Sequence, residues 1–356
     1  MFIMEQLQDF PLKIELFDPL TASEDLWNQF FIYNEILEKE EHPKDPYPSR
    51  EYIKKWMKDI TPYGKNYRWI VRESNDGSKI IGYGATHVST DKNPNYDTTK
   101  NVSDGWISVL PKYRRRGIGK KLLFQVVNKA REENRSIFQS GAVLDCGREF
   151  LKFLLGENVM ESAENRLYLE NVDWELMDRW RRNGKFRAKN VSIETFNDLS
   201  EEDIDEYMEI YTETMNQQPF GGLEGRYKGT PETRRHMEKR FKDKGIEWIT
   251  KITRESDGRI SGLTEIFYSD EESHLIQQML TGVKERYRGR GLGKWLKSEM
   301  MFLIKEKYPK ASFLSTGNAD SNAPMLSINN RMGFKRELAG TSYKWEVKKL
   351  LEMLKE

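Results

Sequence analysis

The chain is short of cysteine, of net charge and of long apolar runs, and each shortage excludes a class of protein. The single cysteine, Cys146, cannot form an intramolecular disulfide, so a reducing, cytoplasmic setting fits better than a disulfide-stabilised secreted fold. The 58 basic and 57 acidic side chains nearly cancel, so no global basic field draws the protein to nucleic acid or an anionic membrane. No apolar run approaches the length of a bilayer span. The four histidines show no metal-ligand spacing, and we expect no metal.

A length of 356 residues exceeds the usual size of one domain, and the sequence repeats one pattern of elements. Each half begins with a β-like stretch and helical segments, and continues with an expected β-hairpin that turns at Asp76-Gly77 or at Asp257-Gly258. A further strand, a glycine-containing loop and a long amphipathic helix follow in both halves. We therefore expect an N-terminal domain over 1–172, a helical connector over 173–189 and a C-terminal domain over 190–356. Strands mixed with helices and hairpins predict a mixed α/β (α+β) architecture in each half.

The glycine loops carry the strongest functional indication. Glycines between a strand and a helix let the backbone curl until several N–H groups point at one spot, where the helix N-terminus adds partial positive charge. This geometry suits a phosphate, and finding it twice predicts a phosphorylated cofactor. The residues expected to hold it in the second half are Arg288, Gly289, Arg290, Gly291, Leu292, Gly293 and Lys294. Their counterparts in the first half are Val109, Arg114, Arg116, Gly117 and Gly119.

The spacing of these loops excludes two common phosphate-binding motifs. A P-loop needs Ser or Thr after its lysine, where this chain has Lys121 and Trp295. A dinucleotide fingerprint needs a third small residue, where Leu122 and Leu296 stand. The remaining pattern, Arg-x-x-Gly-x-Gly, resembles motif A of the GNAT acyl-CoA N-acyltransferases, whose loop cradles the pyrophosphate of acetyl-CoA.

A second stretch strengthens this resemblance. Residues 316–334 resemble GNAT motif B, with Asn322 expected as a helix N-cap and Gly333 as the glycine after the helix. In that family the motif flanks the pantetheine arm, so the resemblance also implies that Asn322 helps to bind the cofactor. The tandem layout and this ending are similar to the double-GNAT group that includes mycothiol synthase. The first half has no such ending at 147–158. The resemblance implies two tandem GNAT-like domains, each with a mostly antiparallel sheet whose fourth and fifth strands splay apart to admit acetyl-CoA as co-substrate.

The resemblance also implies a reaction, the transfer of an acyl group to an amine. An amine must lose its proton before it attacks a thioester, and aligning Gly82 with Gly262 places Glu265 in the second half opposite Ala85 in the first. Glu265 is our candidate base, and an ordinary solvent-facing strand glutamate is the alternative. Alanine cannot accept a proton, so the first half is expected to be non-catalytic. Main-chain groups near Thr281 and Val283 are expected to pair with the pantetheine arm.

Three further interpretations follow from the resemblance. Many GNAT enzymes have a tyrosine acid where this chain has Asn329, which can only hydrogen bond the leaving sulfur; Tyr343 is an alternative donor. The loop over 216–227 would line the acceptor site through Gln217, Glu224 and Tyr227. We thus expect a cytoplasmic acetyl-CoA-dependent N-acetyltransferase for a small-molecule primary amine. The alternatives are a non-catalytic acyl-CoA-binding regulatory protein and, through the basic runs at 114–116 and 179–187, nucleic-acid binding, which the neutral overall charge disfavours.

Overall fold

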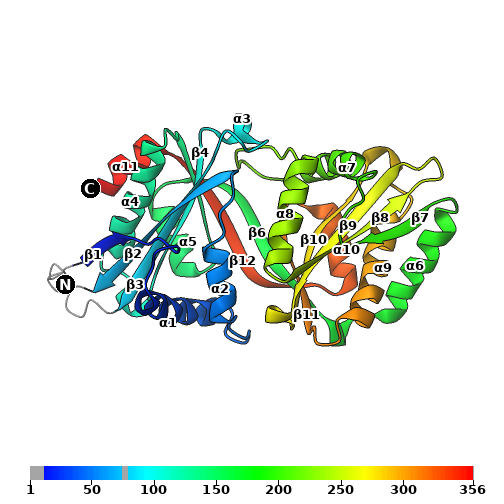
Figure 1. Ribbon diagram of the computed structural model, residues 1–356, viewed down its shortest axis with the longest axis horizontal. Helices are drawn as coiled ribbons and strands as arrows, with labels where there is room; N and C mark the ends of the chain where they lie inside the picture. Colours follow the sequence, from blue (N-terminus) through cyan, green and yellow to red (C-terminus); the bar gives the residue numbers. More distant parts are fainter. Residues whose placement is uncertain (1–11, 74–78, 356) are drawn as a thin grey trace. The chain divides into compact units, whose positions relative to one another are not determined.

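The computed structural model describes residues 12–73 and 79–355, which form two compact units (Figure 1). Unit 1 contains residues 1–159, 222–225 and 341–356, and unit 2 contains residues 160–221 and 226–340. The expected turn at Asp76-Gly77 lies outside the described residues. None of the described helices is both long enough and apolar enough to cross a membrane.

Unit 1 consists of a six-stranded sheet and its helices. In chain order its elements are β1 (Leu12–Leu16), α1 (Glu24–Glu41), α2 (Arg50–Met57), β2 (Gly64–Glu73), β3 (Ile80–Ser89), α3 (Tyr96–Thr99), β4 (Val102–Val109), α4 (Ile118–Glu132), β5 (Ile137–Ala142), α5 (Asp145–Phe153) and, from the C-terminus, the end of β12 (Lys335–Glu346) and α11 (Val347–Lys355). The strand order is β1-β2-β3-β4-β5-β12, and only the β4–β5 pair is parallel. The sheet is therefore mostly antiparallel, as expected.

Unit 2 repeats this arrangement. Its elements are the later part of β6 (Glu157–Tyr168), α6 (Trp174–Arg187), β7 (Ser192–Phe196), α7 (Ile204–Asn216), α8 (Pro231–Asp243), β8 (Ile246–Arg254), β9 (Ile260–Ser269), β10 (Leu275–Val283), α9 (Leu292–Lys307), β11 (Phe313–Ala319), α10 (Ala323–Met332) and the start of β12. The strand order is β7-β8-β9-β10-β11-β6, again with one parallel pair, β10–β11. Both halves thus have the same mixed α/β plan.

Each unit takes its last strand from the other half of the sequence. Residues Ser162–Tyr168 of β6 pair with β11 in unit 2, whereas Thr341–Glu346 of β12 pair with β5 in unit 1. The helices after these strands follow the same exchange, because α6 packs on α9 and α11 packs on α4. The observed division therefore differs from the expected ranges 1–172 and 190–356. The expected connector is α6, an integral helix of unit 2.

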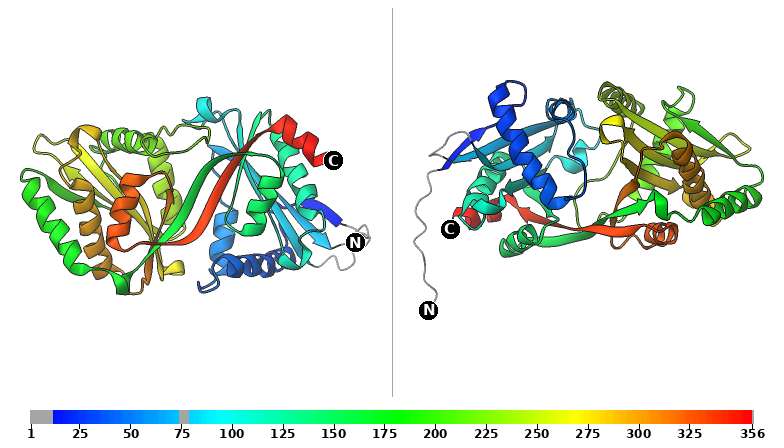
Figure 2. Two further views of the ribbon diagram at one scale, coloured as in Figure 1. Left: turned by 180° about the vertical axis from the view of Figure 1, so that it is seen from behind. Right: turned by 90° about the horizontal axis from the view of Figure 1, so that it is seen from below.

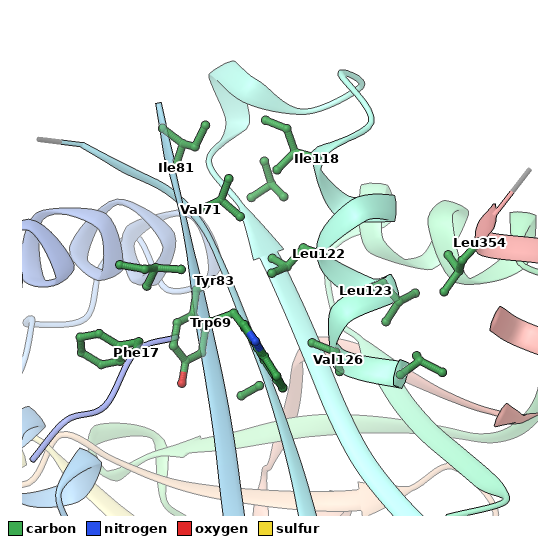
Figure 3. Close-up of a cluster of buried hydrophobic side chains, with 14 of the residues drawn as sticks. Phe17, Trp69, Val71, Ile81, Tyr83, Ile118, Leu122, Leu123, Val126 and Leu354 are labelled. Carbon is green, nitrogen blue, oxygen red and sulfur yellow. The ribbon is translucent and has the colours of Figure 1, made fainter. Parts of the chain in front are cut away.

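Helices cover both faces of each sheet. In unit 1, Tyr83 of β3 lies 5.6 Å from the ring of Phe30 in α1, while a Cβ on the next residue, Gly84, would meet Leu122 of α4. Since neighbouring strand residues point to opposite faces, α1 and α4 cover opposite faces. Figure 3 shows Phe17 and Tyr83 toward α1, and Leu122 and Val126 on α4. Figure 2 gives two further views of these layers.

The second unit has the same two-sided packing. A Cβ on Gly262 of β9 would meet Leu296 of α9, whereas its neighbour Leu263 packs with Tyr207 of α7. Odd-numbered residues at this point of β9 therefore face α7, and even-numbered residues face α9. This alternation decides the surroundings of Glu265, which must point toward the α7 side.

Candidate functional site

The glycine loop of unit 2 has the curled backbone that its sequence predicts. Gly289 and Gly291 have left-handed φ values of 81° and 86°, and Gly291 is the N-cap of α9. No side chain caps this helix, and the first turn of any helix leaves its N–H groups without intrahelical partners. The curled loop and the helix dipole therefore make this end of α9 suited to an anion.

The loop of unit 1 keeps the same conformation with a less suitable sequence. Gly117 has φ of 75° and is the uncapped N-cap of α4, but the position of Gly289 is taken by Arg115, with φ of 62°. An arginine in this region is strained by about 1–2 kcal/mol, so surrounding contacts must impose the conformation. Arg114 is one such contact, with a bidentate ion pair of 2.6 and 2.5 Å to Glu40 of α1.

Arginine side chains of the second loop also have partners in unit 2. Arg288 donates to the backbone oxygen of Val283 at 3.2 Å and to the side-chain oxygen of Gln217. Arg290 forms an ion pair of 2.8 Å with Glu255. Gln217 was expected to bind the acceptor, but its side chain contacts the phosphate loop. These contacts fix the loop and leave its main-chain donors as the available anion ligands.

Next to each loop, the parallel strand pair separates. The β10–β11 pairing covers only Leu275 to Gln277 on β10, and the β4–β5 pairing covers only Val102 to Asp104 on β4. Beyond these points the later residues of β10 have no paired partner on the β11 side. This splay, implied by the GNAT resemblance, leaves a strand edge that a peptide-like ligand can extend. Thr281 and Val283, both expected to contact the cofactor, lie on this part of β10, where Val283 also approaches Gly293.

A β-bulge distinguishes the two halves. Gln278 pairs with Ile266 and Thr281 pairs with Thr264, so Met279 and Leu280 together oppose the single residue Glu265. A bulge removes backbone groups from the ladder and is common beside active sites. The β3–β4 register in unit 1 is unbroken, with Ala85 paired to Trp106. No local pattern in β4 or β10 indicates this difference.

Glu265 lies at the centre of a buried polar cluster. Its side chain is 0% exposed, which rules out the solvent-facing interpretation. Oε1 accepts hydrogen bonds from Tyr207 of α7 and, at 2.6 Å, from Arg234 of α8. Arg234 is itself 2% exposed, pairs with Glu238 at 2.7 Å and stacks 3.5 Å over the Trp248 ring. Oε2 of Glu265 is buried and has no hydrogen-bond partner among the described residues.

The charges of this cluster shift the pKa values of its neighbours. Burial, and then the Glu265 carboxylate, raise the pKa of Tyr207 and Tyr211 well above the ordinary value. The same two causes raise the pKa of Tyr227 to about 12. Burial alone would lower the pKa of Arg234, but Tyr207 and Glu265 outweigh it and raise the value. The three tyrosines of the site therefore keep their phenol protons at neutral pH.

The other predicted residues are distributed differently. Asn322 is the N-cap of α10, as expected, accepting from the backbone N–H of Met325 at 3.4 Å. Asn329 is buried and donates to Asn318 at 2.9 Å. Tyr343, the alternative donor, lies in unit 1, where it is paired with Ser140 of β5 and stacked on Trp345.

Of the expected acceptor residues, Tyr227 lies near Glu265, whose charge raises the pKa of both Tyr227 and Tyr211. The rings of these two tyrosines are 5.4 Å apart. Glu224 belongs to unit 1, where its backbone N–H donates to Gln139 at 2.7 Å and its carboxylate pairs with Lys344. Sequence reasoning missed Arg234 and Tyr207, which no local pattern connects to Glu265. No described cluster of histidine, cysteine or acidic side chains has the arrangement needed for a metal ion.

Comparisons with known proteins agree with this architecture. Residues 26–143 match the Acetyltransferase (GNAT) family, and no curated protein matches the sequence. Among solved structures, the tandem GNAT protein of the clavulanic acid biosynthesis pathway, without acetyl-CoA, has a TM-score of 0.73 and 17% identity over 95% of this chain and 99% of its own. A GCN5-related N-acetyltransferase from Sphaerobacter thermophilus has a TM-score of 0.64 and 14% identity over 94% and 96%.

A third similar structure is a GCN5-related glucosamine N-acetyltransferase region in a fungal multi-domain β-N-acetylglucosaminidase. It has a TM-score of 0.65 and 12% identity, covering 95% of this chain and 38% of that one. At these identities the structural matches show the fold. The family match falls in the first half, which lacks motif B and an acidic residue at the site of Glu265. The chain thus has a tandem GNAT fold, and its first half is also recognisable as GNAT from sequence.

Proposed function

We propose that the protein is an acetyl-CoA-dependent N-acetyltransferase that acts on a small-molecule primary amine in unit 2. The observation that carries this proposal is the buried Glu265 opposite the bulge in β10, beside the point where β10 and β11 separate. Neither the bulge nor the carboxylate occurs at the corresponding place in unit 1. We therefore assign the chemistry to the second half.

The loop and the splayed strands suit the two ends of an acyl-CoA. Main-chain donors from Gly289 to the start of α9 would bind the diphosphate, whose charge the helix dipole complements. The pantetheine arm would pair with the free edge of β10 near Thr281 and Val283. This path leads the thioester toward Met279 and Leu280, where a backbone N–H outside the ladder can stabilise negative charge on the carbonyl oxygen.

Glu265 would act on the acceptor amine through its unpaired oxygen. Oε2 can accept a hydrogen bond from the incoming ammonium and take its proton, while Oε1 stays bound to Tyr207 and Arg234. The amine nitrogen then bonds to the carbonyl carbon and the carbon–sulfur bond breaks. The thiolate takes, directly or through water, the second proton that the nitrogen must lose to become an amide, and Glu265 releases its own proton to solvent before the next turnover. Asn329 lies in motif B, and its amide supplies a hydrogen bond in place of an acid.

The surroundings of Glu265 favour a small polar amine. Tyr211 and Tyr227 present aromatic rings beside one carboxylate, a combination that attracts an alkylammonium group. The similar fungal region acts on glucosamine, which also carries a primary amine on a small polar molecule. We therefore propose amino sugars, aminoglycosides and polyamines as the first acceptors to test.

The test is thiol release from acetyl-CoA with this panel of amines. We expect Glu265→Gln to lower kcat/KM by about 10²–10⁴-fold, the usual contribution of a general base. Gly291→Trp should abolish activity, because it obstructs the second loop. Gly117→Trp makes the matched change in the first loop and should leave turnover intact.

Activity that survives Gly291→Trp but disappears with Gly117→Trp would move the chemistry to unit 1. Binding of acetyl-CoA without turnover of any amine would favour the regulatory acyl-CoA-binding alternative. No binding of acetyl-CoA at all would refute both functions.

A further inference from the structure

Three cationic side chains from three helices gather at the start of α9. Lys294 of α9 and Arg331 of α10 lie 5.6 and 5.7 Å from the ring of Trp180 in α6. Arg187, at the end of α6, has a guanidinium nitrogen 3.9 Å from the place that a Cβ would take on Gly291. Two of the cations therefore lie beside the Trp180 ring, and the third lies beside the glycine loop.

This cluster lacks the acidic partners that neighbouring cations have. Arg181 and Arg182 of α6, the helix that also carries Arg187, pair with Glu299 and Asp178 at 3.7 and 2.9 Å. Within the described part of the chain, none of the three clustered cations forms an ion pair. The pKa of Lys294 is lowered by burial and then by repulsion from Arg331 and Arg187. Keeping like charges together without counter-charges costs stability, and an anionic ligand would relieve that cost.

The main-chain donors of the loop already account for one anionic group. A diphosphate in the curl of residues 289–293 leaves the charges of Arg187, Lys294 and Arg331 beside it without a partner. Coenzyme A carries a second anionic group, the phosphate monoester on its ribose, and a guanidinium fork suits such a group. We propose that these three side chains bind the ribose 3′-phosphate of coenzyme A and so select it over dephosphorylated forms. This inference rests on the proposed function, because it requires a CoA diphosphate in the loop.

Unit 1 does not repeat the arrangement. Its helix α11 takes the place of α6 against the long helix; the nine residues of α11 include Lys348, Lys349 and Lys355 but no arginine, so no guanidinium fork stands where Arg187 does in unit 2. Lys120 occupies the position of Lys294, while no atom lies within 4 Å of a Cβ placed on Gly117. Selectivity for the 3′-phosphate is therefore a property of the second loop.

The experiment compares the binding of CoA and of 3′-dephospho-CoA by calorimetry. All variants carry Gly117→Trp, so that the measured heat comes from ligand binding at the second loop alone. We expect CoA to bind at least about tenfold more tightly than 3′-dephospho-CoA, because only CoA carries the phosphate dianion that can form charge-assisted contacts with the three cations. Arg187→Gln with Arg331→Gln should remove most of this preference while leaving the affinity for 3′-dephospho-CoA unchanged. Arg182→Gln is the matched control, since this arginine lies on the same helix but pairs with Asp178.

Equal affinity for both ligands in the Gly117→Trp protein would overturn the inference while leaving the proposed function standing. A double variant that weakens both ligands equally would also overturn it, because the arginines would then serve the diphosphate or the fold. If neither ligand binds to the Gly117→Trp protein but CoA binds to Gly291→Trp, the proposed function in unit 2 fails as well. Preference for CoA that depends on Arg187 and Arg331, and not on Arg182, supports the inference.

Discussion

Removing the guanidinium of Arg234 should destabilise the sheet around Glu265. This side chain pairs with two buried carboxylates, Glu238 and Glu265, at 2.7 and 2.6 Å, and stacks on Trp248. Breaking such a buried pair by removing one partner costs about 3–5 kcal/mol, because a charge is left uncompensated. Methionine preserves part of the stacking, and Glu238 keeps its second partner, Arg235. We therefore expect Arg234→Met to cost about 3–4 kcal/mol.

Most of this cost should disappear when the negative charge of Glu265, which Arg234→Met leaves without its partner, is removed as well. In Arg234→Met with Glu265→Gln, the neutral amide oxygen still accepts from Tyr207, so we expect a cost of about 1–2 kcal/mol. Global unfolding of a two-unit chain is not two-state, so the measurement is hydrogen exchange of peptides from β8 and β9. Arg259→Met is the control, since this exposed arginine lies 3.7 Å from Glu206 and should cost under about 0.5 kcal/mol. Additive effects of the two substitutions would refute the reasoning.

Three further changes test the packing and the loops. Burial lowers the pKa of Lys297 to about 7, so between that pH and the ordinary lysine pKa the unfolded chain binds one proton more than the folded chain. Lys297→Met should therefore stabilise the protein most below pH 7 and least near pH 10. A difference in denaturation midpoint between the variant and the parent protein that does not change with pH would contradict this. Gly289→Arg should reduce the protection of α9 from hydrogen exchange by about 1 kcal/mol, and Arg115→Gly should increase that of α4, because both positions have left-handed φ; changes of the same sign would disprove the strain. Gly184→Ala places a Cβ 2.4 Å from Trp295, so faster exchange in α6 and a cost of about 1–3 kcal/mol are expected, and an unchanged melting temperature would show that the helices tolerate it.

Sequence reasoning succeeded where a local rule decides the conformation. The left-handed glycines at 289 and 291, and the capping residue Asn322, follow from backbone sterics and nearby hydrogen bonds, so a short window contains the information. The two long helices beginning at Ile118 and Leu292 were likewise predictable from apolar periodicity. The fold and the phosphate loops depend mainly on such features.

It failed where distant residues meet. Arg234 is 31 positions from Glu265, and only the tertiary packing of α8 on β8 brings the two together. Sequence reasoning left open whether Glu265 is the candidate base or an ordinary solvent-facing strand glutamate, because burial depends on which helix covers that face of the sheet. The bulge at Met279 and Leu280 depends on the register against β9, which the sequence of β10 alone does not specify. The surroundings of Glu265 were therefore harder to predict than the conformation of the glycine loops.

The exchange of β6 and β12 has a consequence for how the protein is made. Unit 1 lacks its sixth strand, and the core residues Trp345 and Leu350, until the last twenty or so positions have left the ribosome. A nascent chain that ends anywhere in the second half would expose the open edge of β5, and such edges template aggregation. Cutting the gene at its midpoint should yield two insoluble fragments rather than two autonomous enzymes. A single cut in the chain therefore cannot separate the two units, because each contains segments from both halves of the sequence.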